Sequence, residues 1–158
     1  MTWFIVFLVF AMLVSPIAWL IPSTSQKRIE AMRAEARKQG FHVQLVSLPQ
    51  TRREQVRKQE VIQGACYRLP WRDDLRCSRE CQFLRDQPPE ERAGDWPEAC
   101  FDALPSSVVA LDSNRLGTAM YWREQGEPEQ LVSAVGVLQD WQAQLQALNR
   151  KRPRASGD

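Results

Sequence analysis

The residues of this chain with the widest chemistry are its four cysteines, Cys66, Cys77, Cys81 and Cys100. Thiolates bind zinc, form disulfides and act as nucleophiles. Structural zinc sites commonly use two pairs of cysteines about two to four residues apart, and only Cys77 and Cys81 have that spacing. We interpret all four as free, partly buried thiols. Two alternatives remain: a zinc ion bound by all four, or two disulfides if the domain lies outside the cytoplasm.

The other groups that could do chemistry have no predicted partners. His42 is the only histidine and lies at a polar position of a strand pattern, whereas a general base or a catalytic triad needs positioned neighbours. The adjacent carboxylates Asp73/Asp74 and Glu90/Glu91 are typical of helix caps and solvated loops. The sequence therefore predicts no catalytic residue and no cofactor, and we expect a protein that is not an enzyme.

Aromatic residues offer a different kind of site. Most of the tryptophan, tyrosine and phenylalanine rings after residue 60 are expected in the core, because each buries a large apolar area. Trp71 and Trp96 are flanked by prolines and charged residues instead. Exposed aromatic side chains mark interfaces, so these two are candidates for a partner-binding surface.

The amino-terminal segment predicts that the chain is attached to a membrane. The run from Thr2 to Ile21 has no ionisable side chain and would span roughly 30 Å as a helix, about the thickness of a bilayer core. Trp3 and Trp19 stand near its ends, as membrane-interface aromatics do. A cleaved signal peptide is the rival interpretation, but the segment lacks a basic start and is longer than a signal's apolar stretch. We expect a transmembrane anchor at 1–21.

Basic residues follow the apolar run and none precedes it. They are Lys27, Arg28, Arg33, Arg37 and Lys38. The positive-inside rule then places the amino terminus in the periplasm and the rest in the cytoplasm of a bacterial inner-membrane, single-pass protein. The lipid bilayer is one expected partner, and these cations could also contact anionic lipid. Nucleic acid is not an expected partner, because no aromatic residues are interleaved with the basic ones.

Periodicity and turn residues predict the elements that follow. Ser23 and Gln26 have capping-box spacing and Gly40 suits a helix end, so residues 22–40 form a basic juxtamembrane helix. Residues 41–148 form one small α+β domain, and 149–158 form a disordered basic tail. Within the domain we expect strands at 41–45 and 65–69, a solvated linker or short helix at 50–60, a helix from 73 or 74 to 84, a loop at 86–105, a hairpin of 108–111 with 117–123, and an amphipathic helix at 128–148.

The segment IPSTSQKRIEAMRAEARKQG, with the uncharged span before it, resembles the small YajC subunit associated with the bacterial Sec translocon. The similarity covers the first quarter of the chain, and the Trp-, Cys- and Pro-rich region 66–141 departs from that family. The whole chain is also similar to uncharacterised single-span inner-membrane proteins of Gram-negative bacteria, which implies no activity.

These patterns together predict a transmembrane helix followed by a cytoplasmic α+β domain with a mostly antiparallel sheet. The expected function is that of a membrane-tethered protein-interaction module or accessory subunit of an inner-membrane complex, with an unidentified membrane or cytoplasmic protein as partner. The alternative is a membrane-anchored regulatory domain that depends on thiols or zinc at Cys66, Cys77, Cys81 and Cys100.

Overall fold

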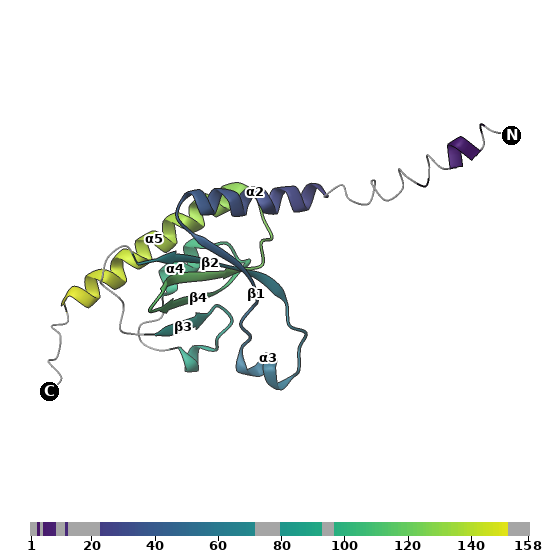
Figure 1. The fold of residues 1–158 in the computed structure, drawn as a ribbon. Coiled ribbons are helices and arrows are strands. Elements are labelled where there is room, and N and C mark those ends of the chain that lie inside the picture. The colour runs from purple at the N-terminus through teal and green to yellow at the C-terminus, as the bar shows by residue number, and fades with distance from the viewer. Residues whose placement is uncertain are drawn as a thin grey trace. The chain divides into compact units, whose positions relative to one another are not determined.

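The computed structural model describes residues 3, 5–8, 12, 23–71, 80–92 and 97–151, with the backbone alone for 89 and 149–151. The chain divides into two compact units, Met1–Ala31 and Met32–Asp158. The second unit contains a five-stranded antiparallel sheet together with helices (Figure 1). The prediction of an α+β domain with an antiparallel sheet is confirmed.

The first long helix, α2 (Thr24–Lys38), begins and ends where local signals predict. The Ser23 N–H donates to Gln26 Oε1 and the Gln26 N–H donates to Ser23 Oγ, both at 3.2 Å, which is the reciprocal pair of a capping box. Gly40 follows with a φ of 87°, in the left-handed region that glycine adopts without a steric penalty from Cβ. Met32 and Ala36 are the buried residues of this helix.

The sheet has the strand order β1-β2-β5-β4-β3, so β1 and β3 are its edges. The strands are β1 (His42–Ser47), β2 (Gln63–Pro70), β3 (Cys81–Leu84), β4 (Val108–Asn114) and β5 (Gly117–Trp122). Directly opposite residues share a face, so the register divides the side chains between the two faces. As predicted, Thr118, Met120 and Trp122 lie on one face and Ala119 and Tyr121 on the other.

The last helix, α5 (Pro128–Lys151), packs on the face that carries Met120 and Trp122 and forms the main core with it. Phe83 of β3 meets Trp141 of α5 edge to face, with ring centroids 6.4 Å apart. A short helix, α4 (Glu98–Ala103), packs against α5. The buried residues of α5 are Leu131, Ala134, Val135, Leu138, Trp141 and Gln142. Most of these recur at the helical spacing that predicted this helix.

Three local predictions are corrected. Residues 81–84, expected at the end of a helix, form β3, because pairing with β4 outweighs the helical spacing of Cys81 and Leu84. The expected loop at 86–105 contains the 3₁₀ turn η1 (Pro89–Glu91) and α4. The hairpin turn falls at 115–116, since β4 continues through Asn114. The expected short helix in 50–60 is α3 (Arg52–Val56), capped by Thr51.

The predicted transmembrane anchor is wrong. Within the part of the chain that the structure describes, no helix is both long and apolar enough to cross a bilayer. The 15-residue α2 is rich in Lys and Arg, and the 24-residue α5 carries Glu129 and Asp140. Of the predicted segment 1–21, only residues 3, 5–8 and 12 are described. The predicted single-pass membrane class, inner-membrane localisation and periplasmic amino terminus are corrected with it.

Candidate functional site

The outer edge of β1 has no neighbouring strand, because β1 is one of the two edge strands of the sheet. The Leu48 N–H donates to the Ile62 carbonyl at 2.9 Å, which makes this opposed pair a hydrogen-bonded one. Hydrogen-bonded pairs alternate along an antiparallel ladder, so Gln44 and Val46 also turn their backbone groups toward β2. The N–H and C=O groups of Val43, Leu45 and Ser47 therefore point outward. We call these outward groups the β1 edge.

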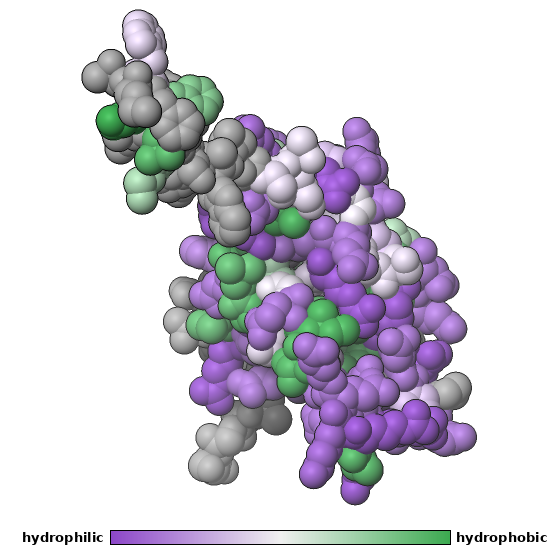
Figure 2. All heavy atoms as spheres, turned by 90° about the vertical axis from the view of Figure 1, so that its right-hand side faces the viewer, coloured by the Kyte–Doolittle hydropathy of each residue, from purple (hydrophilic) through white to green (hydrophobic). Residues whose placement is uncertain are grey.

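Side chains leave the β1 edge accessible. Leu45 is 68% exposed although it belongs to an apolar face of the sheet, and Val43 is half-buried. The strand has six residues and contains no proline, no glycine and no Lys, Arg, Asp or Glu, which are the usual devices that protect an edge strand. The opposite edge strand, β3, has only four residues. Figure 2 views the molecule from the right-hand side of Figure 1. On this face, hydrophobic residues (green) lie among hydrophilic ones (purple).

A polar network occupies the face of the sheet opposite α5. Arg68 donates to Asn114 Oδ1 at 2.7 Å and lies 3.5 Å from Asp112 Oδ2, and the Asn114 amide donates to the same carboxylate at 3.0 Å. Cys66 interacts with Arg68 and Tyr121. Burial raises the pKa of Asp112, against the opposing effect of Arg68. Burial also raises the pKa of Cys66, so this thiol is protonated at neutral pH and is a poor nucleophile.

A second network lies on the helix-covered side. Arg33 of α2 forms a two-pronged ion pair with Glu124, whose Oε1 also accepts a hydrogen bond from the Tyr67 hydroxyl at 2.7 Å. Glu124 is 5% exposed and has a φ of 54°, an uncommon conformation for a residue with a Cβ. Burial, and then the hydrogen bond to Glu124, raise the pKa of Tyr67. These contacts join α2 to the sheet.

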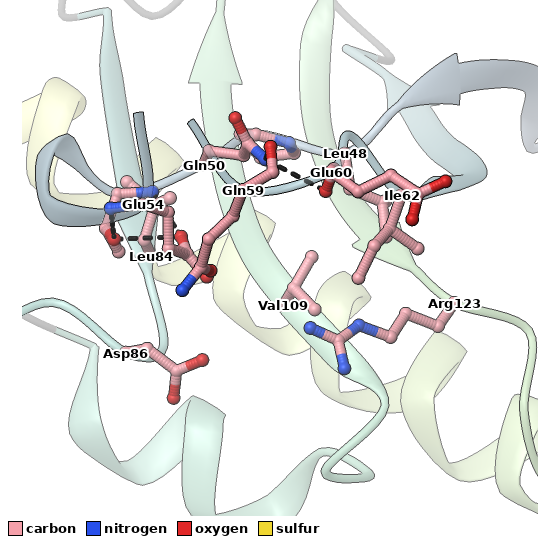
Figure 3. A pocket seen from close by; sticks show the side chains of 12 residues that line it. Leu48, Gln50, Glu54, Gln59, Glu60, Ile62, Leu84, Asp86, Val109 and Arg123 are labelled. Carbon is pink, nitrogen blue, oxygen red and sulfur yellow. Dashed lines mark hydrogen bonds between the residues drawn. The ribbon is translucent and has the colours of Figure 1, made fainter. Parts of the chain in front are cut away.

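A small pocket lies where the β1–β2 connection approaches the ends of β3, β4 and β5. Figure 3 shows Gln50, Gln59 and Glu60 on one side of it and Asp86, Val109 and Arg123 on the other. Gln50 donates to the carbonyls of Gln59 and Glu60, which holds the connection closed on itself. The volume is about 40 Å³, enough for about one water molecule. Pockets that bind metabolites are roughly ten times larger.

The described cysteines do not converge on one site. Cys66 and Cys100 are free thiols. In the strand register, Cys66 lies opposite Tyr121 and Cys81 lies opposite Ser113, so the two cysteines are on opposite faces of the sheet. Cys100 belongs to α4. In the described ranges, no three His, Cys, Asp or Glu side chains form a group that could hold a metal ion. Cys77, the fourth predicted ligand, lies outside those ranges.

The other predicted site residues are dispersed. His42 is exposed at the start of β1. The Trp71 indole N–H donates to the Asn114 carbonyl at 2.8 Å, so this ring is partly buried against β4. Trp96, the second residue of the predicted partner surface, lies outside the described residues, as do Asp73 and Asp74. Glu90 and Glu91 are in η1, where Glu91 is exposed and its carbonyl accepts a hydrogen bond from Gln87.

The residues predicted to lie at a membrane interface have separate roles. Trp3 is 86% exposed, and Trp19 lies outside the described residues. Lys27 and Arg28 belong to the first half of α2 and Arg37 and Lys38 to its last turn. Lys38 pairs with Glu35 at 3.1 Å, which lowers the pKa of that carboxyl. Arg33 is taken up by the buried Glu124, as described above.

Comparisons with known proteins add no information on function to this geometry. No protein-family model matches the chain, and neither the curated proteins nor the solved structures include a significant match.

Sequence reasoning identified the strand at 41–45 but missed the β1 edge as a site. The alternation of Val43 and Leu45 with polar residues predicts a strand. The absence of any Lys, Arg, Asp, Glu, Gly or Pro within that strand was the available signal. Its meaning depends on whether the strand is central or at the edge, which the strand order of the sheet decides.

Proposed function

We propose that this chain is a non-enzymatic protein-interaction module that binds an extended segment of a partner protein along the β1 edge. The observation that carries the proposal is the outward row of backbone groups on Val43, Leu45 and Ser47 beside an exposed Leu45. Adding a strand to an exposed sheet edge is a common mode of peptide recognition, in which main-chain hydrogen bonds provide affinity and alternate side chains provide specificity.

The rest of the domain supports this proposal. The sheet is anchored from behind by α5, so its edge is presented by a packed scaffold rather than by a mobile loop. The two polar networks are satisfied internally and are consistent with structural roles. The pocket beside the β1–β2 connection has room for water but not for a metabolite. Binding at the edge requires no pocket, since the partner's backbone replaces the missing neighbouring strand.

The test uses the alternation of backbone groups in β1. Peptides are selected from a random display library against the intact protein, and amide hydrogen exchange is measured with and without them. We expect slower exchange at the outward amides of Val43, Leu45 and Ser47, because a bound strand accepts hydrogen bonds from them. Binding without any protection at these three amides would contradict the proposal.

Two substitutions separate backbone from side-chain effects. Leu45→Pro removes an outward N–H and leaves the ladder to β2 intact, so we expect binding to weaken at least about tenfold, the equivalent of one to two hydrogen bonds. Leu45→Ala keeps the N–H and is the matched control, with a smaller loss. Ser47→Pro provides a second outward position, and circular dichroism confirms the fold of each variant. Unchanged binding by both folded proline variants would refute the β1 edge.

A further inference from the structure

The charges around β1 identify the chemistry of the segment it binds, if the proposed function is correct. The strand itself carries no Lys, Arg, Asp or Glu. Basic residues lie at both of its ends: Arg37 and Lys38 precede it in the last turn of α2, and Arg52, Arg53, Arg57 and Lys58 follow it in and after α3. A strand added along β1 would therefore run between two basic groups.

Most of these cations have no carboxylate partner within the described chain. Arg37, Arg52, Arg53, Arg57 and Lys58 are all exposed. The ion pairs Arg33–Glu124, Lys38–Glu35, Arg68–Asp112 and Arg115–Glu80 involve none of these five residues. Glu54, the nearest carboxylate in α3, accepts hydrogen bonds from the Thr51 N–H at 2.6 Å and the Thr51 hydroxyl at 2.8 Å. The basic groups at the two ends of β1 are left largely uncompensated.

We infer that the β1 edge binds an extended acidic segment of another protein, with an uncharged centre beside Val43 and Leu45 and carboxylates at its two ends. The centre would place apolar side chains on the helix-covered face, because cross-strand neighbours share a face and Leu45 is exposed there. The carboxylates would then lie near the basic groups. Complementary charge of this kind raises the association rate and excludes wrong partners more than it adds affinity.

A second copy of this chain fits the same edge less well. Two β1 strands paired antiparallel about a two-fold axis would bring the Arg52–Lys58 end of one copy beside the Arg37–Lys38 end of the other. Both ends are basic, and like charges that face each other across a strand pair are destabilising. Single-stranded nucleic acid also fits less well, because β1 presents no exposed aromatic ring other than the imidazole of His42 for bases to stack on.

The experiment compares three synthetic peptides that share a Thr-Val-Thr-Val-Thr centre and carry aspartate, serine or lysine pairs at both ends. Binding to the intact protein is measured by calorimetry at low salt and after adding salt. We expect the aspartate peptide to bind about fivefold tighter than the serine peptide, with the lysine peptide weakest, as expected for several exposed ion pairs. Added salt should shrink these differences, since exposed charges are screened.

Charge-reversal variants locate the effect. Arg53→Glu and Arg37→Glu, at the two ends of β1, should each reduce the preference for the aspartate peptide and leave the serine peptide bound. Arg115→Glu is the matched control, because Arg115 is also exposed but lies in the β4–β5 turn, where it pairs with Glu80 at 3.5 Å. A preference that follows Arg115 rather than Arg53 and Arg37 would overturn the inference.

The outcomes distinguish this inference from the proposed function. Equal affinity for the three peptides, with protection of the outward amides, would overturn the acidic preference and keep the β1 edge. No protection by any peptide would count against the β1 edge itself. A dimer in sedimentation that Leu45→Pro abolishes would assign the edge to a second copy. If a polyuridine oligonucleotide protects the outward amides, the basic groups bind single-stranded nucleic acid, and the inference of an acidic protein segment is overturned.

Discussion

The side chain of Glu124 connects α2 to the sheet. Its carboxylate pairs with Arg33 and accepts a hydrogen bond from Tyr67, while its own backbone is held at a positive φ. A buried carboxylate is costly unless it is paired, and its partners are costly once it is removed. The network is therefore expected to stabilise one arrangement of α2 on the sheet rather than to take part in chemistry.

Glu124→Ala should lower the free energy of unfolding by about 2 to 4 kcal/mol, because it leaves the Tyr67 hydroxyl and the half-buried Arg33 without their acceptor. Glu124→Gln keeps an acceptor and should cost less. Urea denaturation measures both. Lys38→Ala is the control, since its pair with Glu35 is exposed to solvent and should contribute little. Equal losses for Glu124→Ala and Lys38→Ala would contradict this account.

The thiols should differ in reactivity. Burial raises the pKa of Cys66, so the folded protein holds this proton more tightly than the unfolded chain does. The thiol thus favours folding below its ordinary pKa, and this contribution is lost as the pH rises through the higher folded value. Burial raises the pKa of Cys100 as well, but Cys100 is only half-buried, so at about pH 8 iodoacetamide should label Cys66 more slowly than Cys100. Peptide mass spectrometry reads the order, and unfolding in urea should abolish it.

At the scale of elements, three glycines show how position decides the effect of one methyl group. Gly117 opens β5 with a φ of 150°, and a Cβ there would lie 2.1 Å from the Leu69 carbonyl oxygen. Gly40 ends α2 at a positive φ but has open space around it. Gly136 is inside α5, also with open space. A substitution therefore tests mainly a steric clash at Gly117, backbone strain at Gly40 and helix propensity at Gly136.

The three alanine substitutions should differ in sign as well as size. Gly117→Ala should destabilise by more than about 2 kcal/mol, since the backbone it meets cannot move without breaking the sheet. Gly40→Ala should cost about 1 kcal/mol from its left-handed backbone. Gly136→Ala should stabilise by about 0.5 to 1 kcal/mol. Thermal unfolding of the three variants checks this order, and a destabilising Gly136→Ala would count against the packing of α5.

At the scale of the whole domain, α5 and the sheet share one core. Leu138 is fully buried between them, whereas Leu148, ten residues further along the same helix, is 62% exposed. Layers that share a core should unfold together, because neither can bury its apolar face without the other.

Leu138→Ala should therefore cost about 2 to 5 kcal/mol, and Leu148→Ala less than about 0.5 kcal/mol. The check is denaturation followed in parallel by far-ultraviolet circular dichroism, which reports helices and strands, and by tryptophan fluorescence, which reports buried rings such as Trp122. Both midpoints should shift together in Leu138→Ala. Separate midpoints for the two signals would mean that the layers are not one cooperative unit.

The sequence by itself determined the features that depend on neighbouring residues. The capping box of Ser23 and Gln26, the left-handed Gly40, the pairing of two neighbouring strands as a hairpin and the spacing of apolar residues in α5 all depend on residues close together in the chain. The same local reasoning was wrong for the anchor and for residues 81–84. A helical spacing of Cys81 and Leu84 carries no information on whether β4 is available as a neighbour.

Only the tertiary structure decided which strand lies at the edge and which charges are paired. Strand order places β1 outermost and gives Val43, Leu45 and Ser47 their outward backbone groups. Folding also brings Arg33 to Glu124, across most of the domain's sequence, and leaves Arg37 and Arg53 exposed. Such relations join residues far apart in the chain, and their energy comes from pairing and burial that no local pattern of side chains specifies.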